Sequence, residues 1–185
     1  MENRPYVCPA EFAGSLDNIF RRLVHKPVRI LGPYIREGMT VLDFGCGPGY
    51  FTPELARLAG SEGRVIAADI QQKMLDKMAI KIRGTELERR VEAHLCGSDR
   101  IGISQRIDFV LAFWMIHEVP DQMSIFRELK SLLNPGGRIL IIEPRIHVTA
   151  RSFENMISKL ESAGLGIIER PKISLSRSVL VMPII

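Results

Sequence analysis

Short apolar segments alternate along this chain with longer segments in which the apolar residues recur at helical spacing. The apolar segments predict strands over residues 39–44, 64–69, 90–95, 107–113 and 138–143. The amphipathic segments predict helices over residues 50–59, 71–82, 121–133 and 149–163. Such alternation gives five βα units and is typical of a parallel sheet with helices on both faces.

The two ends of the chain depart from this alternation. Residues 14–36 predict one or two helices, interrupted near Pro27 and Pro33 because proline removes a backbone donor. Residues 166–185 predict two strands joined by a turn near residues 171–174, which we expect to form an antiparallel hairpin.

The predicted fold is therefore α/β and Rossmann-like. It is a three-layer sandwich whose seven-stranded sheet is mostly parallel and ends in a C-terminal antiparallel hairpin. One domain spans residues 1–185, with an N-terminal helical segment over 1–36 and the core over 37–185.

A glycine-rich loop connects the first strand to the first core helix, in residues 41–51, VLDFGCGPGYF. Its glycines alternate, whereas dinucleotide-binding loops use G-x-G-x-x-G. Pro48 removes one N–H donor, and Asp43 places a carboxylate ahead of the first glycine. A carboxylate repels a diphosphate and attracts a cationic α-amino group. The loop thus favours a nucleoside that carries an amino acid, the alternative being a turn without a ligand.

The acidic-x-Gly-x-Gly-x-Gly pattern resembles motif I of the class I S-adenosylmethionine-dependent methyltransferases. The segment GCGPG is similar to that of the small-molecule group, which includes ubiquinone/menaquinone-biosynthesis and arsenite methyltransferase-like enzymes. The order of motifs extends the resemblance over residues 39–185. It implies S-adenosylmethionine as the cofactor. The loop residues at its amino-acid end would be Asp43, Gly45, Cys46, Gly47 and Gly49.

The next two strands end in residues that the resemblance assigns to the nucleoside. Asp69 would accept both ribose hydroxyls, or else act as the N-cap of the helix that starts at Gln71. Ile70 would lie on the adenine face. Ser98 or Asp99 would bind the adenine amino group, although both residue types are also common in plain turns.

The fourth and fifth strands would supply the methionine side of the cofactor and the acceptor side. Phe113 and Trp114 would line the methionine portion, where an aromatic face attracts a sulfonium, or else belong to the core. His117 is the candidate general base, the alternative being a helix-start histidine beside a solvated Glu118. The candidates after the fifth strand are Glu143, Pro144, Arg145 and His147. The first three of these either bind a polar acceptor or pair with one another.

Small relatives that lack a separate substrate domain use an N-terminal lid, and residues 1–36 would serve as one here. The lid candidates are Tyr6, Phe12, Asp17, Asn18 and Phe20. The three cysteines, Cys8, Cys46 and Cys96, are too widely spaced for a disulfide framework or a zinc knuckle. We expect inert buried thiols; the alternative is a Cys8–Cys96 pair that takes a soft metalloid acceptor.

Charge and hydropathy restrict the partners. The sequence has 25 Lys and Arg and 21 Asp and Glu, which gives a net charge of +4. Because the basic residues are scattered along the chain, we expect no nucleic-acid partner. The longest apolar run, residues 109–116, is eight residues and too short for a membrane span. No secretory pattern opens the sequence, so we expect a cytoplasmic protein.

Several acceptor classes are excluded by motifs that their methyltransferases carry after the fourth strand. The sequence there lacks Asx-Pro-Pro-aromatic, Pro-Cys, a pair of glutamates and an acidic metal-binding cluster. We therefore expect metal-independent methyl transfer to a small molecule by direct in-line displacement, with no metal site. The alternatives are a non-catalytic S-adenosylmethionine-binding partner or regulatory protein, and a nicotinamide dehydrogenase. The sequence leaves the oligomeric state open.

Overall fold

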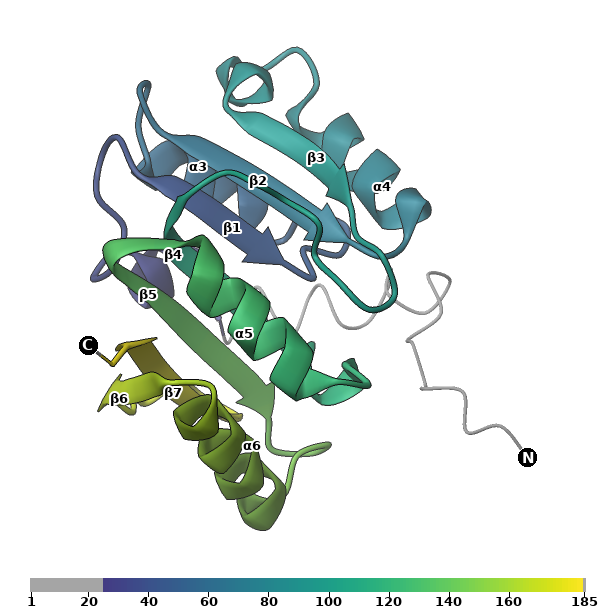
Figure 1. Ribbon diagram of the computed structural model, residues 1–185. Coiled ribbons are helices and arrows are strands. Elements are labelled where there is room, and N and C mark those ends of the chain that lie inside the picture. Colours follow the sequence, from purple (N-terminus) through teal and green to yellow (C-terminus); the bar gives the residue numbers. More distant parts are fainter. Residues whose placement is uncertain (1–24, 185) are drawn as a thin grey trace.

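The computed structural model describes residues 25–184, which form a seven-stranded sheet between two layers of helices (Figure 1). The strands are β1 Thr40–Phe44, β2 Arg64–Asp69, β3 Val91–Leu95, β4 Ile107–Phe113, β5 Leu133–Pro144, β6 Leu165–Glu169 and β7 Ser176–Pro183. Their order across the sheet is β3-β2-β1-β4-β5-β7-β6, and β7 runs antiparallel to both of its neighbours. The predicted fold class is confirmed.

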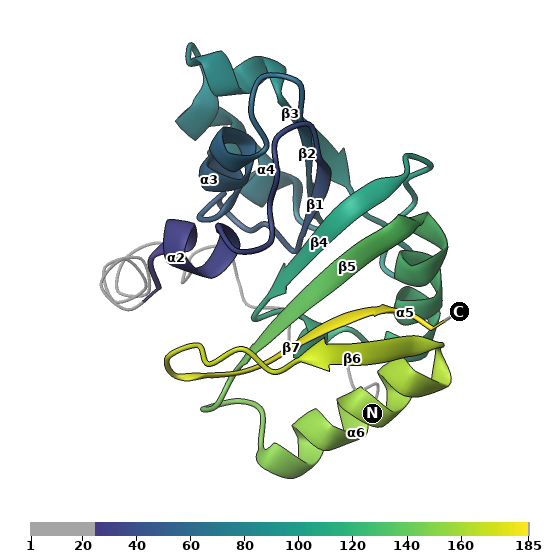
Figure 2. The same ribbon diagram turned by 90° about the vertical axis from the view of Figure 1, so that its left-hand side faces the viewer.

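The helices divide between the two faces of the sheet because successive strand residues point to opposite sides. On one face lie α2 Pro27–Leu31, α3 Thr52–Leu58 and α4 Gln72–Ile82, and on the other α5 Gln122–Leu132 and α6 Ala150–Ser162 (Figure 2). Val41 accordingly packs in the hydrophobic core beneath α2, α3 and α4, and the next residue, Leu42, packs in the core beneath α5 and α6. Two short 3₁₀ helices, η1 Glu86–Arg89 and η2 Ile116–Glu118, complete the structure. Within residues 25–184, no helix has the length and apolar character needed to cross a bilayer.

The order in which strands are added to the sheet changes direction between the neighbouring strands β1 and β4. From β1 the chain continues to β2 and β3 on one side, whereas β4, β5, β7 and β6 extend the sheet on the other. Phe44 near the end of β1 is paired with Ala68 and with Ala112, so the ends of three strands meet at one edge. In open α/β sheets, ligands bind in the crevice at this kind of reversal.

One predicted boundary is wrong: strand β5 begins at Leu133 instead of residue 138. The interruption expected near Pro27 coincides with the start of α2 at that residue, because a proline at the first helical position gives up an N–H that would have no partner there.

Residues 134–137 lie between the predicted helix 121–133 and the predicted strand 138–143, and in the structure they form an irregular part of β5 beside β4. The register passes from Ile107–Leu133 to Phe109–Arg138, so these four residues stand opposite Asp108 alone. Asn134 Nδ2 donates to Asp108 Oδ1 at 2.6 Å, and the backbone N–H of Thr40 donates to Oδ2 at 2.8 Å. One carboxylate thus ties β1, β4 and β5 together at the edge opposite the crevice.

The predicted lid residues Tyr6, Phe12, Asp17, Asn18 and Phe20 lie outside the described part of the chain, as does Cys8. The role of residues 1–36 as a lid therefore stays a prediction.

We expect Asp108→Ala to lower the free energy of unfolding by about 1–3 kcal/mol, because two donors lose their acceptor. Urea denaturation followed by circular dichroism measures this difference. Asp76→Ala is the control, since Asp76 accepts a hydrogen bond from Gln72 on an exposed helix surface. Equal midpoints for the two variants would contradict the bridging role of Asp108.

Candidate functional site

The glycine loop between β1 and α3 has the geometry that its alternating glycines predict. Gly45, Gly47 and Gly49 have φ angles of +70°, +52° and +72°, a region that other residues seldom adopt. A Cβ on Gly45 would lie 2.7 Å from Met115 Cγ, and one on Gly49 would lie 2.5 Å from Met78 Cγ. A Cβ on Gly47 would meet no atom within 4 Å. The outer glycines therefore permit close packing, while the middle one faces open space.

The carboxylate of Asp69, at the end of β2, holds this loop in place. Its Oδ2 accepts the N–H of Gly47 at 2.9 Å, and its Oδ1 accepts the N–H of Gln71 at 2.9 Å. Burial raises the pKa of Asp69, although these main-chain donors act in the opposite direction. Gln71 is itself the N-cap residue of α4, so Asp69 fixes the approach to the helix and is not its cap. Each carboxylate oxygen keeps acceptor capacity for a ribose hydroxyl.

Asp43 is buried behind the loop with 3% of its surface exposed. Thr52 donates its hydroxyl to Asp43 Oδ2 at 2.6 Å. Burial raises the pKa of Asp43 to about 7; the Thr52 hydrogen bond opposes the rise and the charge of Asp69 adds to it. A bound cation would shift this carboxyl toward its charged form. The position thus suits the ammonium group of an amino acid.

The predicted adenine contacts lie on the surface at the same sheet edge. Ile70 is an apolar side chain that is 48% exposed directly after Asp69. Ser98 and Asp99 are exposed in the loop after β3, which is joined to β2 by the hydrogen bond from Cys96 N to Asp69 O at 2.9 Å. Their roles toward adenine stay predictions, including the choice between Ser98 and Asp99.

Phe113 and Trp114 form an aromatic cluster at the end of β4. Phe113 is buried, with its ring centroid 4.4 Å from that of Phe51 and 5.1 Å from that of Trp114. Phe113 is thus a core residue at the edge of the site, and any contact with the cofactor stays a prediction.

Trp114 has a φ of +57°, which costs about 1–2 kcal/mol for a residue with a Cβ. Its N–H donates to Ile142 O at 2.7 Å, and Nε1 donates to Ser176 Oγ at 3.0 Å. Strained backbone of this kind is often found at functional sites. The first bond, from the backbone N–H, joins Trp114 to β5, and the second holds the indole against the start of β7.

His25 is a site residue that the sequence analysis missed. It is buried, its ring lies edge-on to Phe113 and Trp114 with centroids 5.3 Å away, and its Nε2 is 2.8 Å from Ser174 O. Tyr50 Oη donates to His25 O at 2.7 Å. A single histidine in a polar N-terminal stretch carries no sequence signal for this placement.

His117 and Glu143, candidates from two different strand ends, are joined in the structure. His117 Nδ1 lies 2.5 Å from Glu143 Oε2, and Nε2 is 4.0 Å from Glu118 Oε1. Glu143 is 1% exposed, and its Oε1 has no hydrogen-bond partner among the described residues. Burial alone would lower the pKa of His117, but the hydrogen bond and the charge of Glu143 raise it.

Of the other acceptor candidates, His147 contacts this pair and Arg145 does not. The ring of His147 stacks on that of His117 at 5.9 Å. One alternative was an ion pair between Arg145 and Glu143. The structure shows no such pair, and Arg145 Nε instead donates to Ser176 O at 3.0 Å. The sequence could not show this division, since Glu143 is buried in β5 whereas Arg145, two residues later, is exposed after the strand ends.

Cys46 and Cys96 are buried free thiols, and burial raises the pKa of both. This fits the expectation of inert thiols, because the reactive form is the thiolate. Residues 25–184 contain no group of three or more His, Cys, Asp or Glu side chains that could hold a metal ion.

Comparison with known proteins identifies the family. The family model described as a methyltransferase domain matches residues 35–171. The chain belongs to the methyltransferase-domain family. Together with a solved structure at 25% identity, this match confirms the resemblance to the class I S-adenosylmethionine-dependent methyltransferases and supports S-adenosylmethionine as the cofactor.

Relatives of this chain include the demethylmenaquinone methyltransferase of Lactobacillus johnsonii, which is 34% identical over 115 residues. The alignment covers 59% of this chain and 45% of that protein. A ubiquinone/menaquinone biosynthesis C-methyltransferase of Klebsiella pneumoniae is 32% identical over 59% of this chain and 44% of its own length. The chain thus spans less than half the length of these curated relatives.

Two solved structures place the fold. An S-adenosylmethionine-dependent methyltransferase from Aquifex aeolicus has a TM-score of 0.86 at 25% identity, covering 96% of this chain and 100% of that chain. Aeropyrum pernix fibrillarin with natively bound S-adenosylmethionine has a TM-score of 0.64 at 16% identity, covering 93% and 74%, and shows a shared fold alone.

The residues around the glycine loop fit S-adenosylmethionine. Open space before Gly47 admits a ligand against the main chain, and the carboxylates of Asp69 and Asp43 are placed for hydroxyls and an ammonium group. The assignment of individual residues to parts of the cofactor stays a prediction.

We expect Gly47→Val to abolish measurable binding of S-adenosylhomocysteine in isothermal titration calorimetry, because the new side chain occupies the open space. The matched control is Gly38→Val, since Gly38 has a φ of +84° and its Cβ would also meet no atom within 4 Å. Both variants carry the backbone strain, so loss of binding in both would contradict a local steric effect.

We expect the affinity for S-adenosylhomocysteine to fall by about tenfold between pH 8 and pH 6, because Asp43 must release its proton to pair with an ammonium group. The pKa of about 7 places the change in this window, with binding weaker at the acidic end. Calorimetry at several pH values measures it. Asp43→Asn should remove this dependence; an unchanged pH profile would refute the role of Asp43.

Proposed function

We propose that this protein transfers the methyl group of S-adenosylmethionine to a small-molecule acceptor by direct in-line displacement, without a metal ion. The observation that carries the proposal is the juxtaposition, at one sheet edge, of the open glycine loop and the His117–Glu143 pair. We further propose that neither nucleic acid nor a membrane is a partner in the reaction.

The relatives support a small-molecule acceptor. Those with 34% and 32% identity are named for demethylmenaquinone and for ubiquinone/menaquinone biosynthesis. Because the alignment covers less than half of each of these proteins, the similarity supports the acceptor class and not a particular quinone.

When bound, S-adenosylmethionine supplies a methyl group already activated by the sulfonium. The protein then has to align the acceptor atom about 3 Å from the methyl carbon and remove a proton where the acceptor carries one. Because the methyl group is activated in advance, the reaction requires no Lewis acid.

His117 is the proton acceptor in this proposal. Glu143 receives the Nδ1–H and so fixes the tautomer in which Nε2 carries the free lone pair. As the imidazole takes up the proton, the buried carboxylate stabilises the resulting positive charge. Glu143 is therefore a positioning residue that acts through His117.

The proposal is tested with S-adenosylmethionine labelled in the methyl group, incubated with the protein and a bacterial extract, with and without a metal chelator. We expect label in the small-molecule fraction and no effect of the chelator. Label in nucleic acid would overturn the acceptor class, and inhibition by the chelator would overturn metal independence. Tight cofactor binding with no transfer would instead support the non-catalytic alternative.

We expect His117→Gln to lower kcat by about 10²–10⁴-fold while leaving S-adenosylhomocysteine binding unchanged. Glu143→Gln should lower kcat less and move the acidic limb of the pH–rate profile to lower pH. The sign follows because Glu143 raises the pKa of His117, and the imidazole acts as a base only above that pKa.

The control is His94→Gln, which we expect to leave the acidic limb in place. His94 lies on β3, where its Nε2 is 2.7 Å from Ile101 O. An acidic limb that stays in place in Glu143→Gln would contradict the positioning role.

A further inference from the structure

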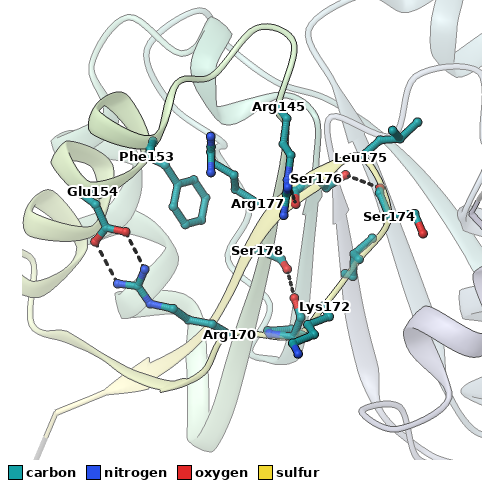
Figure 3. Close-up of a pocket in the computed structure, with 13 residues that line it drawn as sticks. Arg145, Phe153, Glu154, Arg170, Lys172, Ser174, Leu175, Ser176, Arg177 and Ser178 are labelled. Carbon is teal, nitrogen blue, oxygen red and sulfur yellow. Dashed lines mark hydrogen bonds and ion pairs between the residues drawn. The ribbon is translucent and has the colours of Figure 1, made fainter.

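A cavity of about 530 Å³ lies between α6 and the connection from β6 to β7, residues 170–175 (Figure 3). Four cationic side chains line it, and one carboxylate. We call it the basic cavity and define it by Arg145, Phe153, Glu154, Arg170, Lys172 and Arg177. These cations are separated along the chain, so the sequence shows no basic run, and the fold alone brings them together.

The carboxylate in the basic cavity is already neutralised. Glu154 Oε1 and Oε2 lie 2.5 Å and 2.9 Å from the two terminal nitrogens of Arg170. This two-point contact pairs one cation, whereas Arg145, Lys172 and Arg177 form no ion pair with another described residue and leave the cavity with a net positive charge.

Two of these cations are held in fixed orientation. Arg145 Nε donates to Ser176 O at 3.0 Å, and Arg177 Nε donates to Val148 O at 3.2 Å. In the described part of the chain the terminal nitrogens of these two guanidinium groups make no hydrogen bond. Figure 3 shows Arg177 extending from β7 toward Phe153 on α6, and Arg145 reaching the start of β7 beside Ser176. A guanidinium fixed through Nε offers its other donors as a fork that matches a carboxylate or a phosphate.

The basic cavity adjoins the proposed proton acceptor. Arg177 on β7 is the cross-strand partner of Glu143 on β5, and partners in such a ladder have Cα atoms about 4.5–5.5 Å apart. The loop that begins with Arg145 also carries His147, whose ring stacks on His117. Ser176, in the cavity wall, accepts the hydrogen bond from Trp114.

We propose that the basic cavity binds an anionic group, a carboxylate or a phosphate, of the small molecule that accepts the methyl group. The inference rests on the proposed function and specifies its acceptor class. The anion would be held by the forks of Arg145 and Arg177, with Lys172 adding charge. The rest of the acceptor would extend across β5 toward the Nε2 of His117.

The test is isothermal titration calorimetry at low salt with inorganic pyrophosphate and, separately, with malonate. We expect at least one to bind saturably, and the stronger of the two tells a phosphate site from a carboxylate site. The double substitution Arg145→Met and Arg177→Met should weaken that binding by roughly tenfold or more, because the charge-assisted hydrogen bonds are lost while the apolar stems remain.

Arg64→Met is the matched control. Arg64 is an exposed arginine near Arg89 and Arg90 at the far edge of the sheet, where Glu62 and Glu86 line the same hollow. We expect this variant to bind the anion as the unmodified protein does.

The outcomes that overturn the inference are distinct from failure of the proposed function. Absence of anion binding, or equal binding by the double variant, overturns the anion site. Tighter binding of a short single-stranded RNA that is lost in the double variant would overturn a small-molecule ligand. S-adenosylhomocysteine titrated into the same samples reports on the cofactor site, so its failure to bind would count against the proposed function instead.

Discussion

The site depends on one buried carboxylate that joins two loops. Asp69 ends β2, and its two oxygens bind the main-chain N–H groups of Gly47 and Gln71. The glycine loop cannot hold its left-handed conformation through side-chain packing of its own, because its glycines have no side chains. The pair of hydrogen bonds from a neighbouring strand end supplies that constraint. It also leaves the open space before Gly47 free of protein atoms, which is the condition for a ligand to lie against the backbone.

Charge is distributed along the crevice edge in a way that matches the proposed reaction. Asp43 and Asp69 surround the loop where a cationic cofactor would bind, and Glu143 stands at the end of β5. One strand further on, the basic cavity presents Arg145 and Arg177. A carboxylate-rich side suits a sulfonium and an ammonium group, and a cationic side suits an anionic acceptor. The strand order thus separates two groups of side chains of opposite charge, and His117 follows β4, which lies between them in the sheet.

The fold was predictable because its signals are local. The five parallel strands and their helices follow from apolar runs and helical spacing, and the glycine loop follows from three residues within a single turn. The boundary of β5 was missed for a physical reason. Residues 134–137 have the composition of a turn, but the side chain of Asn134 binds Asp108 and keeps the segment beside β4. Such a contact cannot be read from local propensity.

By its own pattern of residues, the chain specifies an α/β sheet, a glycine loop with an acid before it, and an acid at the end of β2. These features depend on neighbours within a few positions, so they can be recognised in the sequence. The pairing of His117 with Glu143 across 26 positions, the burial of His25 and the convergence of distant arginines arise in the folded chain. They depend on strand order and register, which set the distances between segments that no local spacing relates.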